Sequence, residues 1–356
     1  MRKLTQSSYR PVAIWISIGV AMLIIQVLLG GITRLTGSGL SITEWNVITG
    51  TLPPLNEPQW LIEFNKYKQT PQYSLLNTDF TLKDFKFIFF WEWFHRFWAR
   101  LIAVVFLVPF VIFLIQKRFR PEMIKPLLIL FLLGALQGTV GWIMVASGLT
   151  GDEIYVKPTK LAMHFVLALG LISYTFWFAM KLSIPSKQKF FNASLRKWSR
   201  LILGLIFLQL LFGALMAGHK AATAAPTWPT INGWWIPPDM FKYNPPLINF
   251  IENKITIHFL HRGLAYLLLV LILAWTFKAF RITTLCNYFT QTRWLPAALL
   301  FLQVVLGMFA VLSSTYIIPN SWGRFEWIAE LHQIVGMLSL LVMFWMLYLL
   351  RAKKLY

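Results

Sequence analysis

The sequence predicts an all-α integral membrane protein with eight transmembrane helices. We expect them to form two pseudo-symmetric four-helix bundles, with both termini cytoplasmic. Three observations support this fold class: the apolar composition, eight long apolar segments, and the distribution of charge between alternate loops. Of the 356 residues, 57% are hydrophobic, and the mean hydropathy is +0.62. Soluble domains are far less apolar than this.

Eight segments are long enough to cross a bilayer, which takes about 20 apolar residues in a helix. We expect them near residues 13–33, 89–115, 126–148, 160–181, 200–218, 255–278, 294–316 and 326–350. The first apolar run lacks a small-residue cleavage site. It is therefore expected to be retained as a spanning helix.

The net charge of +20 raises the possibility of a nucleic-acid partner, but its distribution argues against one. The tails and alternate loops together carry nineteen Lys and Arg and a single acid, Glu122. This asymmetry is the positive-inside pattern of membrane proteins. It predicts cytoplasmic termini, a bacterial inner (plasma) membrane location and no nucleic-acid partner. The mitochondrial inner membrane, with termini in the matrix, is the less favoured alternative.

The predicted helices repeat two features. Each odd-numbered helix carries a glutamine followed four residues later by a glycine: Gln26/Gly30, Gln137/Gly141, Gln209/Gly213 and Gln303/Gly307. Each even-numbered helix carries a histidine near its outer end: His95, His164, His261 and His332. The repeat divides the chain into an N-terminal half (about 1–185) and a C-terminal half (about 186–356). Both halves begin inside, so an axis along the membrane normal should relate them.

The glutamine–glycine pairs have two interpretations. Glycine permits helices to approach closely and glutamine bonds across them, which is ordinary packing in membranes. Recurrence in four helices instead favours a shared task, such as leaving room for a flat ligand.

The four histidines are expected in one layer of the outer leaflet, because each lies a few residues into its helix. Two histidines from different helices can ligate a haem iron from both faces. Four would serve two haems, with His95 and His164 on one and His261 and His332 on the other. Hydrogen-bonding histidines, or a metal or proton site, are the alternatives.

Four arginines are candidates for binding haem propionates, since a guanidinium holds a carboxylate through two parallel hydrogen bonds. Arg96 and Arg262 directly follow predicted ligands. Arg100 lies one helical turn after Arg96, and Arg34 ends the first span on the outer side.

The two halves differ three residues before the first histidine of each. The N-terminal half has Glu92 there and the C-terminal half has His258. His258 shares a helical face with His261 and is an alternative ligand. Glu92 in an apolar setting could exchange protons, or it could simply pair with Arg96. The difference suggests chemistry in the N-terminal half and a permanent electron carrier in the C-terminal half.

The outer loops are rich in aromatic residues, proline and glycine. The first covers roughly residues 34–88, and its counterpart begins near residue 219. Amphipathic rings settle at the membrane interface. Such loops could cap a site that opens to the outside.

Five segments resemble the haem A synthase family, in particular its proteobacterial and mitochondrial branch. They are "GGITRLTGSGLSITEW" (30–45), "EWFHRFWAR" (92–100), "LAMHFVLAL" (161–169), "HRGLAY" (261–266) and "LHQIVGM" (331–337). The resemblance covers nearly the whole chain in order, including all four histidines.

The resemblance implies an activity. The family oxidises a ring methyl of haem O to a formyl group, giving haem A, through successive hydroxylations with oxygen from water. It implies a haem b cofactor on His261 and His332, and the substrate haem on His95 and His164. Glu92 matches the essential acid of the family. The implied partners are a haem O synthase and a cytochrome oxidase or its assembly factors.

The sequence departs from another branch of the family, which has a cysteine pair in its outer loops. The only cysteine here, Cys286, is expected in a cytoplasmic loop. A thiol-based step is therefore excluded for this chain.

Two other function classes compete with the synthase. One is a di-haem cytochrome b that carries electrons without modifying haem, and the other is a haem transporter or chaperone. Electron transfer across the membrane would need haems at two depths, so the single layer of histidines argues against it but not against lateral transfer. Contact with membrane lipid is expected in every case, and small-residue helix faces permit a homo-oligomer.

Overall fold

The computed structural model describes residues 10–45, 49–317 and 322–351. Within these ranges the regular secondary structure is helical, joined by turns and loops, and two isolated bridges pair Phe191 with Arg351 and Ile231 with Trp234. The predicted basic residues Arg2, Lys3, Lys353 and Lys354 lie outside the described residues.

Eight helices of the described chain are long and apolar enough to cross a membrane, as the sequence predicted. They are α1 (Arg10–Leu35), α4 (Leu82–Ile115), α5 (Pro121–Ala146), α6 (Pro158–Ser183), α7 (Ala193–Gly218), α9 (Lys254–Phe280), α11 (Leu295–Ser313) and α12 (Arg324–Leu349). This is a multi-pass membrane protein. Four shorter helices connect them: α2 (Glu57–Tyr67), α3 (Pro71–Leu76), α8 (Asn249–Glu252) and α10 (Asn287–Thr292).

Most spanning helices begin earlier than the apolar segments predicted, and polar side chains cap α4, α7 and α9. The largest differences are in α7, which starts at Ala193 rather than near 200, and in α4, which starts at Leu82 rather than near 89. There Thr81 and Asp84 form a capping box, in which each side chain accepts a hydrogen bond from the backbone of the other. Asn253 caps α9 by accepting from the backbone N–H groups of Ile255 and Thr256.

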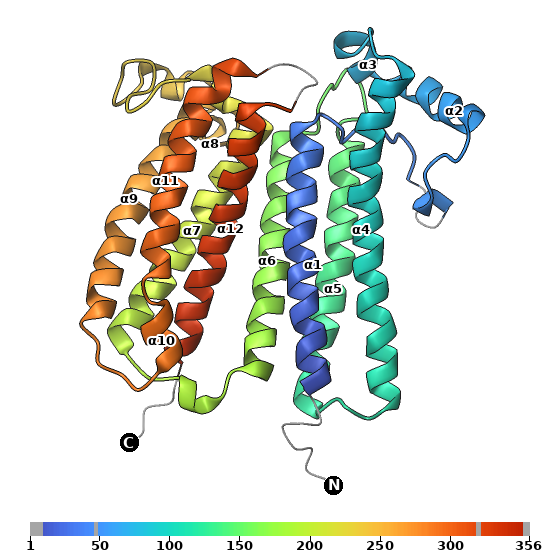
Figure 1. Cartoon of the computed structure of the whole chain (residues 1–356). Coiled ribbons are helices and arrows are strands. Elements are labelled where there is room, and N and C mark those ends of the chain that lie inside the picture. Colours follow the sequence, from blue (N-terminus) through green and yellow to red (C-terminus); the bar gives the residue numbers. More distant parts are fainter. Residues whose placement is uncertain (1–9, 46–48, 318–321, 352–356) are drawn as a thin grey trace.

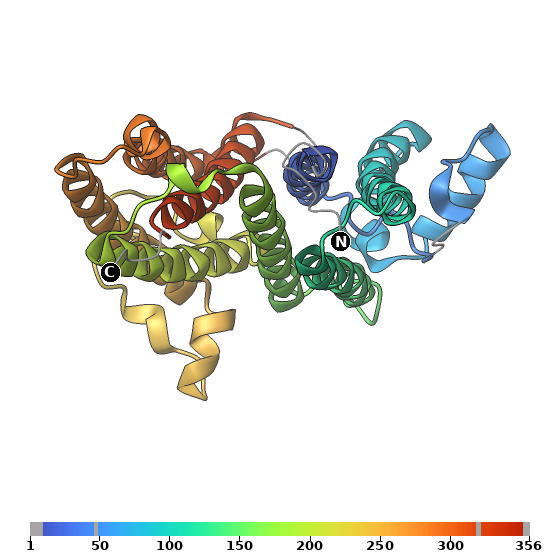
Figure 2. The ribbon, with the colours of Figure 1, turned by 90° about the horizontal axis from the view of Figure 1, so that it is seen from below.

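The helices are arranged in two groups that follow the chain. In the first, α1 packs against α4 and α6, and α5 packs against α6. In the second, α7 packs against α9 and α12, and α11 packs against α9 and α12. Figure 2 shows the two groups side by side, seen along the helices. The groups meet where α6 packs against α7 and where α12 packs against α6 and α1.

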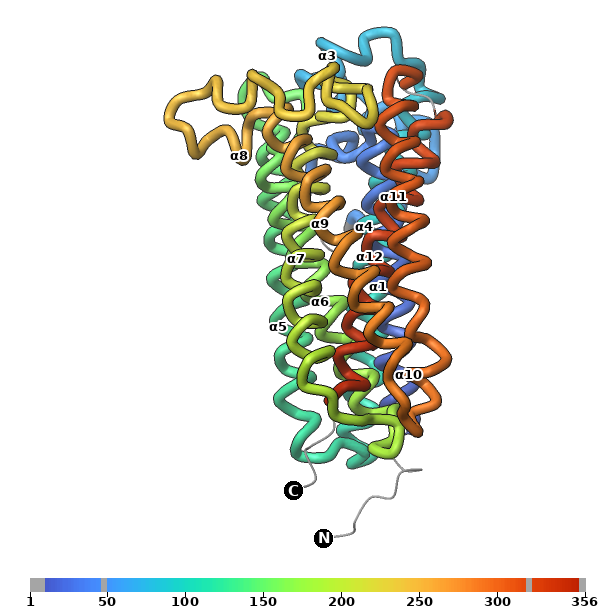
Figure 3. The backbone as a smooth tube through the Cα atoms, turned by 90° about the vertical axis from the view of Figure 1, so that its left-hand side faces the viewer, coloured from blue at the N-terminus to red at the C-terminus, as the bar shows by residue number. Residues whose placement is uncertain are grey.

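The long helices run side by side, with α1 beginning and α12 ending at the same end of the molecule (Figure 1). The segments with α2, α3 and α8 gather at the opposite end (Figure 3). An apolar core fills the inner part of the second group. It includes the fully buried Trp275, Ile272 and Leu268 of α9, packed with Leu300 of α11 and Met346 of α12.

Candidate functional site

The predicted glycines and histidines meet in four pairs of successive spanning helices. Each glycine lies against the histidine of the next spanning helix: Gly30 with His95, Gly141 with His164, Gly213 with His261, and Gly307 with His332. A methyl group on Gly141 would stand 2.8 Å from Cε1 of His164. On Gly307 it would stand 2.9 Å from Cε1 of His332. A larger residue would therefore push these imidazoles out of place.

The glutamines contact the same histidines. Gln137 Nε2 donates to the His164 carbonyl at 3.2 Å, and Gln26 Nε2 donates to the His95 carbonyl at 3.3 Å. In the second group, His261 Nδ1 lies 3.2 Å from the backbone oxygen of Gln209. Gln209 and Gln303 also place Nε2 at 3.3 and 3.4 Å from Nε2 of His261 and His332. The Gln-x-x-x-Gly motif thus contacts the histidine of the next spanning helix, as the packing interpretation predicts, while room for a flat ligand stays a prediction.

The histidines of the second group face each other across a short gap. The ring centres of His261 and His332 are 6.2 Å apart, with an angle of 74° between the rings. Since a metal–imidazole bond is about 2.0–2.1 Å long, this spacing fits two ligands on one metal ion. His258, the alternative ligand, is instead buried against Arg262, whose Nη2 lies 2.9 Å from its Nε2.

A compact metal site of another kind finds no support in the described residues. They contain no group of three or more His, Cys, Asp or Glu side chains that could hold a metal ion. A haem iron has four nitrogen ligands from its own ring, so a pair of histidines, as each group contains, would be enough to complete its coordination.

One large cavity connects both histidine pairs. It has a volume of about 1290 Å³ and is lined by all four predicted ligands: His95, His164, His261 and His332. Small-molecule sites usually enclose about 300–1,000 Å³. The cavity is therefore large for one ligand and spans both halves of the molecule.

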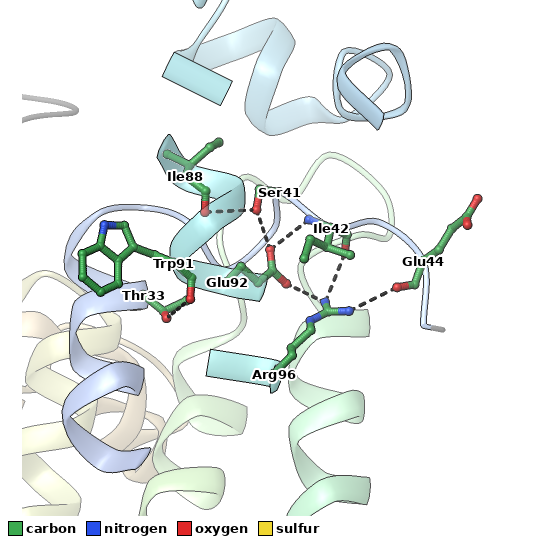
Figure 4. A network of polar contacts seen from close by, with 8 residues as sticks. All are labelled: Thr33, Ser41, Ile42, Glu44, Ile88, Trp91, Glu92 and Arg96. Atoms are coloured by element: carbon green, nitrogen blue, oxygen red, sulfur yellow. Dashed lines mark hydrogen bonds and ion pairs between the residues drawn. The ribbon is translucent and has the colours of Figure 1, made fainter. Parts of the chain in front are cut away.

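Glu92 lies at the outer end of this cavity, in a dense polar network (Figure 4). The residue is only 2% exposed. One carboxylate oxygen accepts from the Ser41 hydroxyl at 2.8 Å and from the Ile42 backbone N–H at 2.9 Å. The other accepts from Arg96 Nη2 at 2.5 Å. Arg96 also donates to the carbonyls of Ile42 and Glu44, both at 3.1 Å. The ion pair thus fastens the outer loop to α4.

Arg262 of α9 likewise links its helix to an outer loop. It donates to the carbonyls of Pro229 and Thr230 at 2.9 Å and to that of Thr227 at 3.0 Å. His258 occupies the place of Glu92, four residues before the arginine, and contacts it in the same way. Sequence reasoning placed both arginines beside a haem but missed their contacts with loop carbonyls, because those carbonyls carry no side-chain signal.

The remaining predicted arginines, Arg34 and Arg100, also line the cavity. Arg34 lies at the outer end of α1 and interacts electrostatically with Glu326 and Glu330 of α12. Both glutamates are buried. Sequence reasoning missed this acidic pair, although two acids near the start of an apolar helix are a visible signal of buried charge.

The first outer loop is held by a second buried network. The Tyr67 hydroxyl donates to Gln72 at 3.1 Å and accepts from Asn77 at 2.7 Å. Burial raises the pKa of Tyr67 to about 12, so the hydroxyl keeps its proton even above pH 10, the ordinary pKa of tyrosine. Gln72 donates onward to the carbonyls of Gly37 and Ile154. The loops above the first histidine pair are therefore linked to each other.

Comparison with known proteins identifies the family. The profile of the cytochrome oxidase assembly protein family matches residues 13–344. The chain is 42% identical to a haem A synthase of Parvibaculum lavamentivorans over 320 residues, 90% of each chain. It is 43% identical to one of Nitrosomonas eutropha over 281 residues, 78% of each. With one of Flavobacterium psychrophilum it shares 38% identity over 337 residues, 93% of this chain and 95% of the relative. The chain therefore belongs to the haem A synthase family of cytochrome oxidase assembly proteins.

Proposed function

We propose that this chain converts haem O to haem A, oxidising the ring methyl to a formyl group through successive hydroxylations with oxygen from water. The product serves cytochrome c oxidase biogenesis. We propose that a haem O synthase supplies the substrate, and that the oxidase or its assembly factors receive the product. One observation carries the proposal. Four histidines, each in contact with a glycine of the preceding spanning helix, line one cavity, and a carboxylate, Glu92, lies three residues before His95 where the other half has His258.

The C-terminal half is proposed to hold haem b between His261 and His332. The 6.2 Å spacing of the two rings supports this assignment, as does the tight packing of Gly213 and Gly307 against them. When bound, haem b supplies a one-electron redox couple. Nδ1 of His261 lies 3.2 Å from the backbone oxygen of Gln209. With its proton on Nδ1, the ring would offer Nε2 to the metal, in place of the present contact between Nε2 and Gln209.

The N-terminal half is proposed to bind the substrate haem between His95 and His164. Propionates would meet Arg96, Arg100 and Arg34 in this half, and Arg262 in the other. All four arginines line the cavity, which supports the assignment.

Glu92 is proposed to act beside the reacting methyl group. Its three hydrogen-bond donors hold the carboxylate in one place. A fixed negative charge stabilises positive charge that develops on the substrate during oxidation. The same carboxylate, one turn from His95, can accept a proton from the attacking water.

The stoichiometry of the reaction sets a further requirement. Oxidation of one methyl group with one water to a formyl group releases four electrons and four protons. An electron acceptor must therefore take up four electrons for each formyl group formed.

To test this, the protein is expressed in the inner membrane of bacterial cells that make haem O but not haem A. The protein is purified in detergent, and its haems are identified by chromatography and mass. We expect haem A, or hydroxylated haem O, together with haem B. Haem B alone, with no new haem in the cells, would instead indicate an electron carrier. A protein without any haem would refute the ligand assignment.

A further inference from the structure

The cavity is much deeper in the N-terminal half than in the C-terminal half. On α1 its lining reaches from Gln26 inward to Trp15, eleven residues or about 16 Å along the helix. On α7 the innermost described lining residue is Gln209, the equivalent of Gln26. On α6 the lining extends to Thr175, eleven residues past His164.

The last lining residue on α12 is Gln333, one past His332. We call the extra space in the N-terminal half, inward of Gln26 and His164, the chamber. The described lining of the C-terminal half reaches inward only to Leu268 on α9, seven residues past His261, whereas on α4 it reaches Leu107, twelve residues past His95.

The equivalent helices explain the difference. Aligning Gln137 of α5 with Gln303 of α11 places Gly134 opposite Leu300 and Gly138 opposite Val304. An added Cβ at either glycine would have no atom within 4 Å. Leu300 by contrast is only 7% exposed and belongs to the core of the second group, against which Val304 packs. Large side chains thus fill in one half the space that glycines leave open in the other.

The helix packing differs in the same place. In the C-terminal half α9 and α11 pack against each other. Their counterparts α4 and α5 are absent from the closely packed pairs of the described chain. Leu107 of α4 and Phe131 of α5 line the cavity and are 43% and 51% exposed. The chamber is therefore open toward the lipid side between α4 and α5.

Apart from Arg100, which lies five residues inward of His95 on α4, the chamber wall is mainly apolar, and two of its polar side chains bond to backbone carbonyls. Thr175 donates its hydroxyl to the Leu171 carbonyl at 2.7 Å. At the floor, Trp15 donates to the Val105 carbonyl at 2.7 Å and stacks on Phe106, with ring centres 5.4 Å apart. Such a surface offers nothing to a polar ligand and suits a hydrocarbon chain.

We propose that this chamber holds the isoprenoid tail of the haem bound in the N-terminal half, with the tail entering sideways between α4 and α5. This rests on the proposed function, since haem O carries that tail and haem B does not. It also explains how two similar half-sites receive different haems. Gly134 and Gly138 leave room for the tail, while Leu300 and Val304 exclude it.

The test fills the chamber with the residues of the other half, as the double variant Gly134→Leu/Gly138→Val. The matched control is Gly204→Leu, which adds a side chain to a spanning-helix glycine that also has open space but does not line the cavity. Each protein is purified with haem B in its C-terminal half. It is then titrated with haem O and, separately, with additional haem B, and binding is followed by absorbance.

We expect the wild type and the control to prefer haem O. In the double variant the affinity for haem O should fall about tenfold or more, while added haem B binds as in the wild type or better. Unchanged haem O affinity would overturn the proposal. Equal loss of both haems would also overturn it, because the space would then serve the haem ring itself. Failure of the wild type to bind haem O would instead refute the proposed function.

Discussion

The two halves of the molecule share one plan for holding a histidine and differ in what surrounds it. Gly141 lies against His164 in one half as Gly307 lies against His332 in the other. Around this common element, the N-terminal half has a buried carboxylate and a deep chamber. The C-terminal half has His258 in place of the carboxylate, and Leu300 and Val304 in place of the two glycines that open the chamber. The comparison teaches that a duplicated binding element becomes specialised through its neighbours, while the element itself is kept.

The largest effects should come from removing one histidine in each half. His332→Ala should eliminate bound haem B, because a single imidazole cannot complete axial ligation. His164→Ala should leave haem B in place and eliminate the substrate haem. Extraction and chromatography of the haems from each purified variant measure both. If His164→Ala instead lost haem B, the assignment of haems to halves would be reversed.

The next largest effect should come from substituting Glu92, the residue at which the two halves differ. Glu92→Gln keeps the size of the side chain but removes the charge, so formation of haem A should fall about 100- to 1,000-fold with haem content kept. His258→Gln is the matched change in the other half and should reduce product formation far less. Product formed per unit of bound haem O separates chemistry from binding. Full activity in Glu92→Gln would rule out the catalytic role and leave Glu92 with a structural role, holding the outer loop to α4 through Ser41 and Ile42.

Much of this comparison could be predicted from the sequence, because the same residue types recur at matching positions in the two halves. The Gln-x-x-x-Gly motif and the four histidines are visible at fixed spacing, and a length of about 20 apolar residues defines each span. The sequence also identified Glu92 and His258 as the point where the halves differ.

The loop contacts and the chamber could not be predicted in this way. Arg96 and Arg262 donate to backbone carbonyls of segments that lie 30 to 55 positions away in the chain. Any residue type supplies such a carbonyl, so composition leaves no trace of the contact. The chamber depends on how far α4 stands from α5, which is a property of packing. Gly134 and Gly138 alone read equally well as close helix contacts.

Smaller effects should follow from single methyl groups placed against the histidines. Gly141→Ala should weaken substrate haem binding about tenfold and spare haem B, because the new Cβ would stand 2.8 Å from His164. Gly307→Ala should weaken haem B binding by a similar factor. Gly30→Ala is the internal control, since its Cβ would stand 3.5 Å from His95, an ordinary contact. Equal effects at all three positions would show that helix packing, not imidazole position, sets the affinity.

The smallest effect should come from the loop network around the Tyr67 hydroxyl in the N-terminal half. Tyr67→Phe removes the hydroxyl that joins Gln72 to Asn77, and it should destabilise the protein by about 1 kcal/mol. The folded-state pKa of Tyr67, about 12, lies above its ordinary value of 10. The stabilising contribution should therefore be complete below pH 10 and decline as the pH rises toward 12, since the unfolded chain loses the proton first. Thermal unfolding of both proteins in detergent, repeated across this range, measures it. A difference that is constant up to pH 12 would mean that the hydroxyl is not buried as the network requires.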